Sequence, residues 1–230
     1  DDFAWENDRI AHRMYGTALE TWVREPLTSS AVDVWCKRVR RLIVNEWYMV
    51  DNYHEDTGEG ADFYSAGRSR GCGGSGIWEN GKLHVSRNFV GSRVLANGPI
   101  RLVFELTYAP WQAGTREVSE VKRITLDAGH NLDRFESYYK SSGTARLVYA
   151  VGIKKGEGST ALSDSKQGWL RTWEPLRKGE AGNLGCGIVI DPSAVVAITE
   201  GDGNYLVIAR CDGRLAGTYY AGFGWDRSGD

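Results

Sequence analysis

The sequence predicts an all-β fold, a large antiparallel β-sandwich with little helix. Apolar and β-branched residues fall into short runs that Gly, Asn and Asp separate, and stripes at helical spacing are scarce. Turn sequences suited to hairpins join many of these runs. About a dozen strands joined in this way form two large antiparallel sheets that pack face to face, because each sheet has to bury one of its faces.

The first half of the chain supplies strands that alternate or flank turns. Ile10 and Met14 fall on one face of an alternating segment, and β-branched residues dominate the next run. Asn80-Gly81 predicts a type I′ hairpin, since both central positions of that turn need positive φ. Asn97-Gly-Pro99 breaks the ladder between two further strands. The strands expected here are 10–15, 32–39, 76–78, 83–85, 89–95 and 100–108.

The second half repeats this pattern with weaker turns. Turn residues at 127–131 and 200–204 separate neighbouring strands, and 147–153 is one of the longest apolar runs. The strands expected here are 118–127, 132–139, 146–153, 168–174, 185–190, 194–200, 205–210 and 218–223. Helical spacing occurs in 18–22 and, through Val39, Leu42, Ile43 and Trp47, in 37–48.

Composition limits the classes of function. The chain has 230 residues, of which 41% are hydrophobic and 25% charged, so we expect one globular domain over residues 1–230. A net charge of -2 gives no basic field for nucleic acid, and no apolar run is long enough for membrane insertion. The chain starts and ends among fold-like residues, so we expect that native N- and C-terminal segments are missing. We expect a periplasmic or secreted bacterial protein, and the sequence leaves its oligomeric state open.

Cysteines and glycines give two further expectations. Cys36, Cys72, Cys186 and Cys211 form no Cys-x-x-Cys pair, so we expect buried thiols, with one disulfide left open as an alternative. Residues 71–76 match the G-x-G-x-x-G letters, but no strand precedes and no helix follows them as a dinucleotide site requires. We therefore expect 66–76 to be a loop that crosses the functional site.

The segment 53–70 concentrates reactive side chains without helical or strand periodicity, and we expect the functional site there. We predict catalytic roles for His54, Tyr53 and Tyr64, and substrate binding by Arg68 and Arg70. The neighbouring carboxylates Glu55, Asp56, Glu59 and Asp62 are alternative partners for these arginines.

Two other segments offer candidate site residues. Strand alternation places His12 and Arg13 on opposite faces; His12 is a candidate catalytic or buried core residue, and Arg13 a candidate substrate ligand. Aromatic rings bind sugars through their faces, and nine Trp residues make such platforms plentiful. Candidates for this role are Trp78, Trp169 and Trp173, with Glu174 beside them.

Several reactions suit these residue types. No Gly-x-Ser-x-Gly elbow is present, while Glu55, Glu59 and Glu174 could serve a glycoside hydrolase. Elimination from a uronic acid calls for Arg at the carboxylate and for His or Tyr in the proton transfers. No cofactor is predicted, although two sets of residues, 54–56 and Asp127 with His130 and Asp133, could supply ligands to a divalent metal.

Four segments together resemble family 4861 of the domains of unknown function: 5–16, 53–64, 95–101 and 219–225. The resemblance covers almost the whole chain, and 124–132 is also similar to a hairpin of galactose-mutarotase-like proteins. It implies a supersandwich fold and dehydration of a uronic acid at the non-reducing end of an oligosaccharide. Our leading hypothesis is thus β-elimination on uronic-acid-containing oligosaccharides, by a dehydratase or lyase that forms a C4–C5 unsaturated uronate. A glycoside hydrolase and a non-catalytic carbohydrate-binding module are the alternatives.

Overall fold

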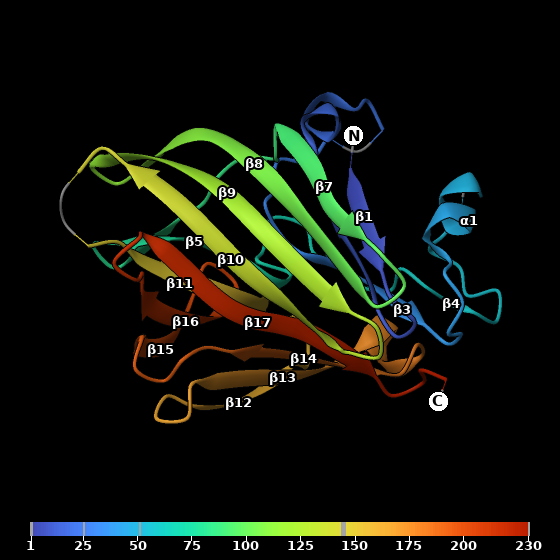
Figure 1. The fold of residues 1–230 in the computed structure, drawn as a ribbon. Coiled ribbons are helices and arrows are strands. Elements are labelled where there is room, and N and C mark those ends of the chain that lie inside the picture. Colours follow the sequence, from blue (N-terminus) through green and yellow to red (C-terminus); the bar gives the residue numbers. More distant parts are fainter. Residues whose placement is uncertain (1, 25, 51, 144–145, 230) are drawn as a thin grey trace.

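The computed structural model describes residues 2–24, 26–50, 52–143 and 146–229. These residues form three antiparallel sheets (Figure 1). The largest has eight strands in the order β12-β13-β14-β17-β10-β9-β8-β7. Its strands are β7 (Gly91–Asn97), β8 (Arg101–Ala113), β9 (Arg116–Asp127), β10 (Leu132–Ser141), β12 (Thr160–Asp164), β13 (Trp169–Pro175), β14 (Asn183–Val189) and β17 (Ala216–Trp225).

Two smaller sheets accompany the large one. The five-stranded sheet has the order β15-β16-β11-β5-β6, and the four-stranded sheet the order β1-β2-β3-β4. Their strands are β1 (Phe3–Glu6), β2 (Ala11–Met14), β3 (Asp33–Lys37), β4 (Gly60–Ala61), β5 (Cys72–Glu79), β6 (Lys82–His84), β11 (Val148–Lys154), β15 (Val195–Gly201) and β16 (Asn204–Arg210). In Figure 1 the four-stranded sheet lies at one end of the molecule, beside α1 (Val44–Met49).

The apolar core fills the space between the two larger sheets. Phe135 of β10 stacks on Tyr219 of β17 at 4.9 Å between ring centroids, and Tyr149 of β11 approaches Tyr219 from the facing sheet. Burying each such side chain contributes about 2–3 kcal/mol to stability. The all-β antiparallel sandwich expected from the sequence is confirmed.

Each expected strand coincides at least in part with an observed one. The sequence did not predict β1, β4 or β12, which have only four, two and five residues. Of the two segments expected to be helical, 37–48 begins with the last residue of β3 and is helical only from Val44 onward. The other, 18–22, lies mostly in the 3₁₀ helix η1 (Thr17–Thr21). Asn80 and Gly81 have φ of 51° and 76°, which confirms the expected turn.

The glycine cluster is not a loop, which corrects the prediction for 66–76. From Cys72 onward it forms β5, a buried strand that pairs with β11 on one side and β6 on the other. A Cβ on Gly73 would lie 2.4 Å from the Cβ of Ala221 in the large sheet. Glycine is therefore required here because the two sheets approach closely, as expected when a glycine-rich backbone passes near another surface.

The cysteines and the helices bear on two other expectations. All four cysteines are buried and free, which fits their expected role as small apolar side chains. Within the described ranges, no helix has the length and apolar character needed to cross a membrane.

Candidate functional site

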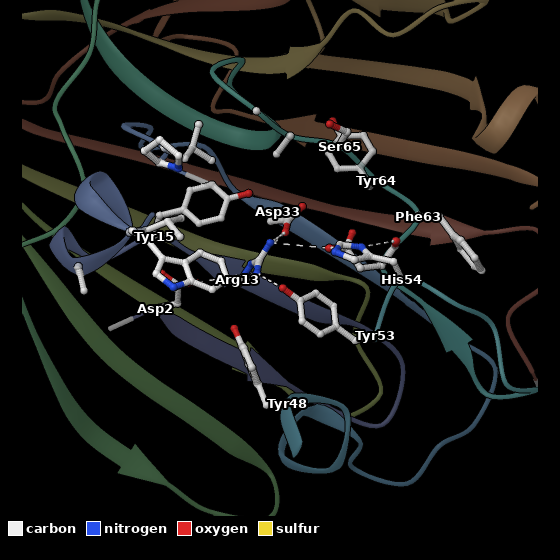
Figure 2. A pocket seen from close by; sticks show the side chains of 18 of the residues that line it. Asp2, Arg13, Tyr15, Asp33, Tyr48, Tyr53, His54, Phe63, Tyr64 and Ser65 are labelled. Carbon is white, nitrogen blue, oxygen red and sulfur yellow. Dashed lines mark hydrogen bonds and ion pairs between the residues drawn. The ribbon is translucent and has the colours of Figure 1, made fainter. Parts of the chain in front are cut away.

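A cavity of about 820 Å³ opens beside the four-stranded sheet (Figure 2). This volume is within the range of pockets that bind small molecules. Its walls come from β2, β3, the segments around η1 and α1, and the chain from Tyr53 to Gly67. The charged and aromatic side chains that line it are Asp2, Arg13, Tyr15, Trp22, Asp33, Tyr48, Tyr53, His54, Asp62, Phe63, Tyr64 and Arg177.

Arg13 lies at the centre of this cavity (Figure 2). Its Nε and Nη2 both donate to Oδ2 of Asp33, at 3.1 and 2.9 Å, and Nη1 donates to Oη of Tyr53 at 3.0 Å. The guanidinium also faces the ring of Tyr15, 5.1 Å from its centroid. Burial opposes the charge on Arg13, but Asp33 and the smaller effects of Tyr15, Tyr48 and Asp62 together outweigh it and raise the pKa of Arg13. Arg13 is thus a fixed cation.

Three carboxylates surround that cation. Besides Asp33, Asp62 lies 3.7 Å from Nη2 and Asp2 lies 3.8 Å from Nη1 of Arg13. Burial raises the pKa of the Asp33 carboxyl, and the nearby guanidinium counteracts part of this rise. Carboxylate oxygens that reach a cavity accept hydrogen bonds, so this group suits the hydroxyls of a sugar.

Tyr53 and His54 stand side by side on the cavity wall, with ring centroids 4.5 Å apart. Tyr53 stacks on Trp35 at 4.9 Å, which fixes the plane of its ring. Nδ1 of His54 lies 3.3 Å from the carbonyl oxygen and 3.5 Å from the carboxylate of Asp62. We infer that Nδ1 carries the proton, because both neighbours are acceptors, which leaves the lone pair of Nε2 for a ligand.

Aromatic rings complete the wall. Tyr64 is buried, its hydroxyl has no hydrogen-bond partner among the described residues, and burial raises its pKa well above the usual range. Tyr48, on α1, packs against both Trp35 and Tyr53. Rings at several angles around polar groups are typical of sites that bind the apolar faces and the hydroxyls of a pyranose.

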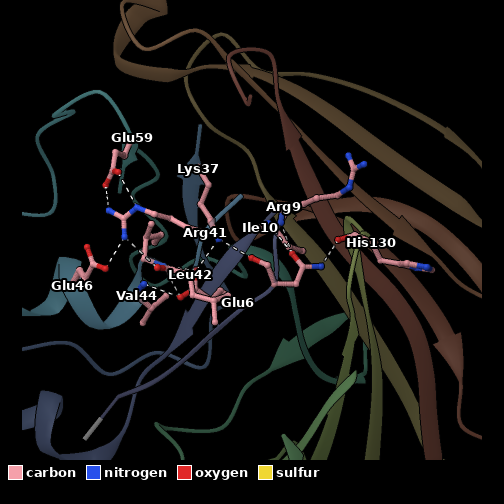
Figure 3. A network of polar contacts seen from close by, with 12 residues as sticks. Glu6, Arg9, Ile10, Lys37, Arg41, Leu42, Val44, Glu46, Glu59 and His130 are labelled. Carbon is pink, nitrogen blue, oxygen red and sulfur yellow. Dashed lines mark hydrogen bonds and ion pairs between the residues drawn. The ribbon is translucent and has the colours of Figure 1, made fainter. Parts of the chain in front are cut away.

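A partly buried carboxylate, that of Glu6, holds α1, and with it Tyr48, in place (Figure 3). Oε1 of Glu6 accepts hydrogen bonds from the backbone N–H groups of Ile43 and Val44, both at 2.8 Å. Oε2 accepts from Nζ of Lys37 at 2.8 Å. The start of α1 is thereby tied to β1 and β3, because an unpaired helix N–H and a buried ammonium each need such a partner.

Arg177 reaches the cavity from a distant part of the chain. Its guanidinium lies over Phe63, 4.9 Å from the ring centroid, and donates to the carbonyl oxygen of His54. Arg177 and Lys178, in η2 (Leu176–Gly179), have φ of 47° and 57°, a left-handed conformation that costs a non-glycine residue about 1 kcal/mol or more. Arg177 of this strained pair lines the cavity.

A second cavity, of about 410 Å³, adjoins the first. Phe63, Ser65 and Arg177 line both. The second cavity is lined further by Lys154, Glu157, Gly158, Glu174, Pro175, Leu176 and Lys178. Nζ of Lys154 forms an ion pair with Glu174 at 3.2 Å. The two cavities therefore form adjoining compartments of one site.

The structure brings together only part of the predicted site. Tyr53, His54, Tyr64 and Arg13 line the first cavity, and Glu174 lines the second. The remaining predicted residues line neither: His12, Arg68, Arg70, Trp78, Trp169 and Trp173.

Four of the remaining residues show why the predicted residues do not all face one cavity. Arg70 is fully buried between the sheets, where it donates to Oγ of Ser30 at 3.0 Å. Arg68 is exposed to solvent. Trp169 and Trp173 share the outer face of β13, as alternation predicts, but that face belongs to the large sheet. The cationic role in the cavity falls instead to Arg13 and Arg177.

His12 points away from Arg13, as alternation predicts, and lies in the core. Its Nε2 is 3.4 Å from Oδ2 of Asp133, and its Nδ1 is 2.8 Å from the carbonyl oxygen of Asp33. Burial lowers the pKa of His12 to about 4 and raises the pKa of Asp133 to about 8. Both side chains are therefore uncharged near neutral pH. The contact between Nδ1 of His12 and the carbonyl oxygen of Asp33 helps to fix the backbone of Asp33.

The two metal-ligand sets considered from the sequence are dispersed. Asp127 pairs with Arg101 at 2.6 Å on the surface, whereas Asp133 is in the core. Across the described residues, no group of three or more His, Cys, Asp or Glu side chains is arranged to hold a metal ion.

Sequence reasoning missed Asp2, Asp33, Tyr48 and Arg177. Asp33 had a signal, since it is an acidic residue in the run 31–36, whose other members are apolar, and so needs a buried partner. Nothing local marked Arg177, which lies 123 residues from its contact His54.

Fold and site together define an all-β protein with a polar, aromatic-walled cavity at one end of its sandwich. The chain belongs to the family described as a domain of unknown function, DUF4861, whose pattern it matches over residues 1–230. The resemblance drawn from the four sequence segments is thereby confirmed for the family.

Comparison with individual proteins adds two similarities. The chain is 34% identical over 244 residues to uncharacterized protein P7 of Formosa agariphila, an alignment that covers 99% of the chain and 60% of that protein. Among solved structures it is similar to the GH36 α-galactosidase AgaA of Geobacillus stearothermophilus in complex with raffinose, with a TM-score of 0.41 and 11% identity over 98% of this chain and 41% of that one. AgaB of the same organism gives 0.37 and 10%, over 97% and 40% of the two chains.

Proposed function

We propose that this chain carries the active site of a carbon-oxygen lyase that acts on uronic-acid-containing oligosaccharides. The enzyme would remove H5 of a uronate and expel the group at C4, which leaves a C4–C5 double bond. The observation that carries the proposal is the Arg13–Tyr53–His54 cluster, with Arg177 beside His54 on the same cavity. An oligosaccharide is the expected partner, and a periplasmic or secreted location fits such a substrate.

The first step needs a group to neutralise the uronate carboxylate. Arg13 is already bound to Asp33 and Tyr53, so its donors are largely committed. Arg177 is exposed and lines the cavity next to His54. Arg177 would hold the carboxylate and, by stabilising the enolate-like charge that develops there, make H5 easier to remove.

Two neighbouring side chains would then move the protons. Nε2 of His54 would take H5, since Asp62 engages Nδ1 and stabilises the imidazolium that forms. Tyr53 would protonate the oxygen that leaves C4, because Nη1 of Arg13 donates to Oη and stabilises the charge left behind. With a hydroxyl at C4 the departing molecule is water; with a glycosyl group there, the glycosidic bond breaks.

The test follows absorbance at the ultraviolet band of the C4–C5 double bond with saturated uronate oligosaccharides as substrate. We expect His54→Ala and Tyr53→Phe each to lower kcat by about 100-fold or more, as loss of a proton-transfer group does. His130→Ala and Tyr220→Phe are matched controls on exposed surface outside the cavity. If both site variants turned over substrate as fast as the active control variants, His54 and Tyr53 would not be the proton-transfer groups.

Glycoside hydrolysis is the second candidate, because Asp33 and Asp62 both line the cavity and both contact Arg13. Two carboxylates at a glycosidic bond are the usual requirement for that reaction. Hydrolysis adds the mass of water to the products, dehydration removes it, and glycosidic elimination conserves total mass. Mass spectrometry of the products therefore separates the three reactions, and unchanged substrate indicates a binding module.

A further inference from the structure

The two cavities differ in the sign of the charge that lines them. In the first, Asp2, Asp33 and Asp62 outnumber Arg13 and Arg177. In the second, Lys154, Arg177 and Lys178 outnumber Glu157 and Glu174. Carboxylates accept hydrogen bonds from hydroxyls, whereas ammonium groups attract anions, so the two compartments suit different chemical groups.

Lys178 is the available cation of the second cavity. Lys154 is engaged by Glu174, whose carboxylate is mostly buried. Lys178, in contrast, is exposed and has no hydrogen-bond or ion-pair partner for its ammonium in the part of the chain that the structure describes. The backbone φ of Lys178 is 57°, a left-handed value that a glycine would adopt without strain. Strain kept in a residue that lines a cavity is a signal of function.

We propose that the second cavity is a subsite for an acidic sugar unit, the neighbour of the unit held in the first cavity, and that Lys178 binds its acidic group. The inference rests on the proposed function, since it assumes an oligosaccharide that spans both compartments. Phe63, Ser65 and Arg177 line both cavities, so neighbouring units of one ligand would occupy adjacent cavities. The enzyme would thus prefer substrates with two consecutive acidic units.

The test is calorimetric titration in a His54→Gln background, in which substrate stays intact. The probes are two disaccharides with the same non-reducing uronate, one with an acidic and one with a neutral second unit. A second acidic probe bears a sulfate in place of the carboxylate, which identifies the acidic group preferred. We expect Lys178→Ala to weaken binding of the acidic disaccharides about threefold at low salt and to leave the neutral one unchanged.

Four more variants sharpen the result. Lys178→Arg keeps the charge and should retain the preference, whereas Lys140→Ala removes one exposed, remote charge and should change nothing. Glu157→Gln removes an acidic group from the cavity and should strengthen binding of the acidic disaccharides. Lys178→Gly should raise the urea midpoint of unfolding, because it relieves strain, and still weaken binding of the acidic probes.

Two outcomes would overturn the inference, and they are distinguishable. If both kinds of disaccharide bind but Lys178→Ala affects them equally or not at all, the subsite is wrong and the proposed function stands. If no uronate disaccharide binds, the proposed function fails and the subsite fails with it.

Discussion

Asp133→Asn should change how the stability of the protein depends on pH. Burial raises the pKa of Asp133 from 3.8 to about 8, so the folded protein holds a proton on this carboxyl at pH 7 and the unfolded chain does not. A raised pKa in the folded state means that stability falls as pH rises between these two values, by about 1.4 kcal/mol per pH unit. Between pH 5 and pH 7 the loss due to Asp133 is thus about 3 kcal/mol.

Asparagine has nearly the same shape and no group that titrates in this pH range, so the variant lacks this loss. His12 acts in the opposite sense, since its pKa is lowered to about 4 and its contribution to stability rises with pH up to its unfolded value of 6.5. The difference between variant and wild type isolates Asp133.

Urea unfolding at pH 5, 6 and 7 measures this difference, followed by the fluorescence of tryptophan, because Trp5 donates to Asp133 at 3.1 Å. The free energy of unfolding of Asp133→Asn, minus that of the wild type, should increase by about 1.4 kcal/mol for each unit by which the pH rises. Parallel pH dependences of the two proteins would refute the reasoning, because they would mean that Asp133 is ionised in the fold.

Three further substitutions test the site and the fold. Arg13→Lys removes the paired donors to Asp33 and the donor to Tyr53, so unfolding free energy should fall by about 2–4 kcal/mol in urea and turnover should drop. Glu6→Gln weakens the tie between α1 and the small sheet and should cost about 1–3 kcal/mol, measured the same way; an unchanged midpoint would contradict that role. Gly73→Ala should cost at least about 2 kcal/mol, since its φ is 102° and its Cβ would meet the large sheet; a neutral effect on the melting temperature would show that the sheets are less close.

The strands were largely predictable because turn residues separate short apolar runs, and because burial alternates along β9, β10, β13 and β14 with the period that a sheet imposes. His12 and Arg13 illustrate this, since alternation alone placed them on opposite faces. The glycine-rich first half of β5 escaped prediction because glycines have no side chains and so show no alternation. Pairing with β11 and β6 stabilises β5 as a strand, since glycine has a low intrinsic preference for strands.

The site was predictable only where it is local in sequence. Tyr53, His54 and Tyr64 were found because they are close together in a polar segment. Arg70, in the same segment, turns into the core because the backbone enters β5 there. Arg177 joins the cavity only through the arrangement of the sheets, and long-range placement of this kind leaves no local pattern in the sequence.

The most direct test of the central claim is the mass of the product formed from a saturated uronate oligosaccharide. We expect a product that absorbs in the ultraviolet band of a C4–C5 double bond. If water leaves C4, this product weighs one water less than the substrate; if a glycosyl group leaves, two fragments form and one of them bears the double bond. Products heavier in total by one water, without the absorbance, would contradict elimination, as would recovery of the intact substrate.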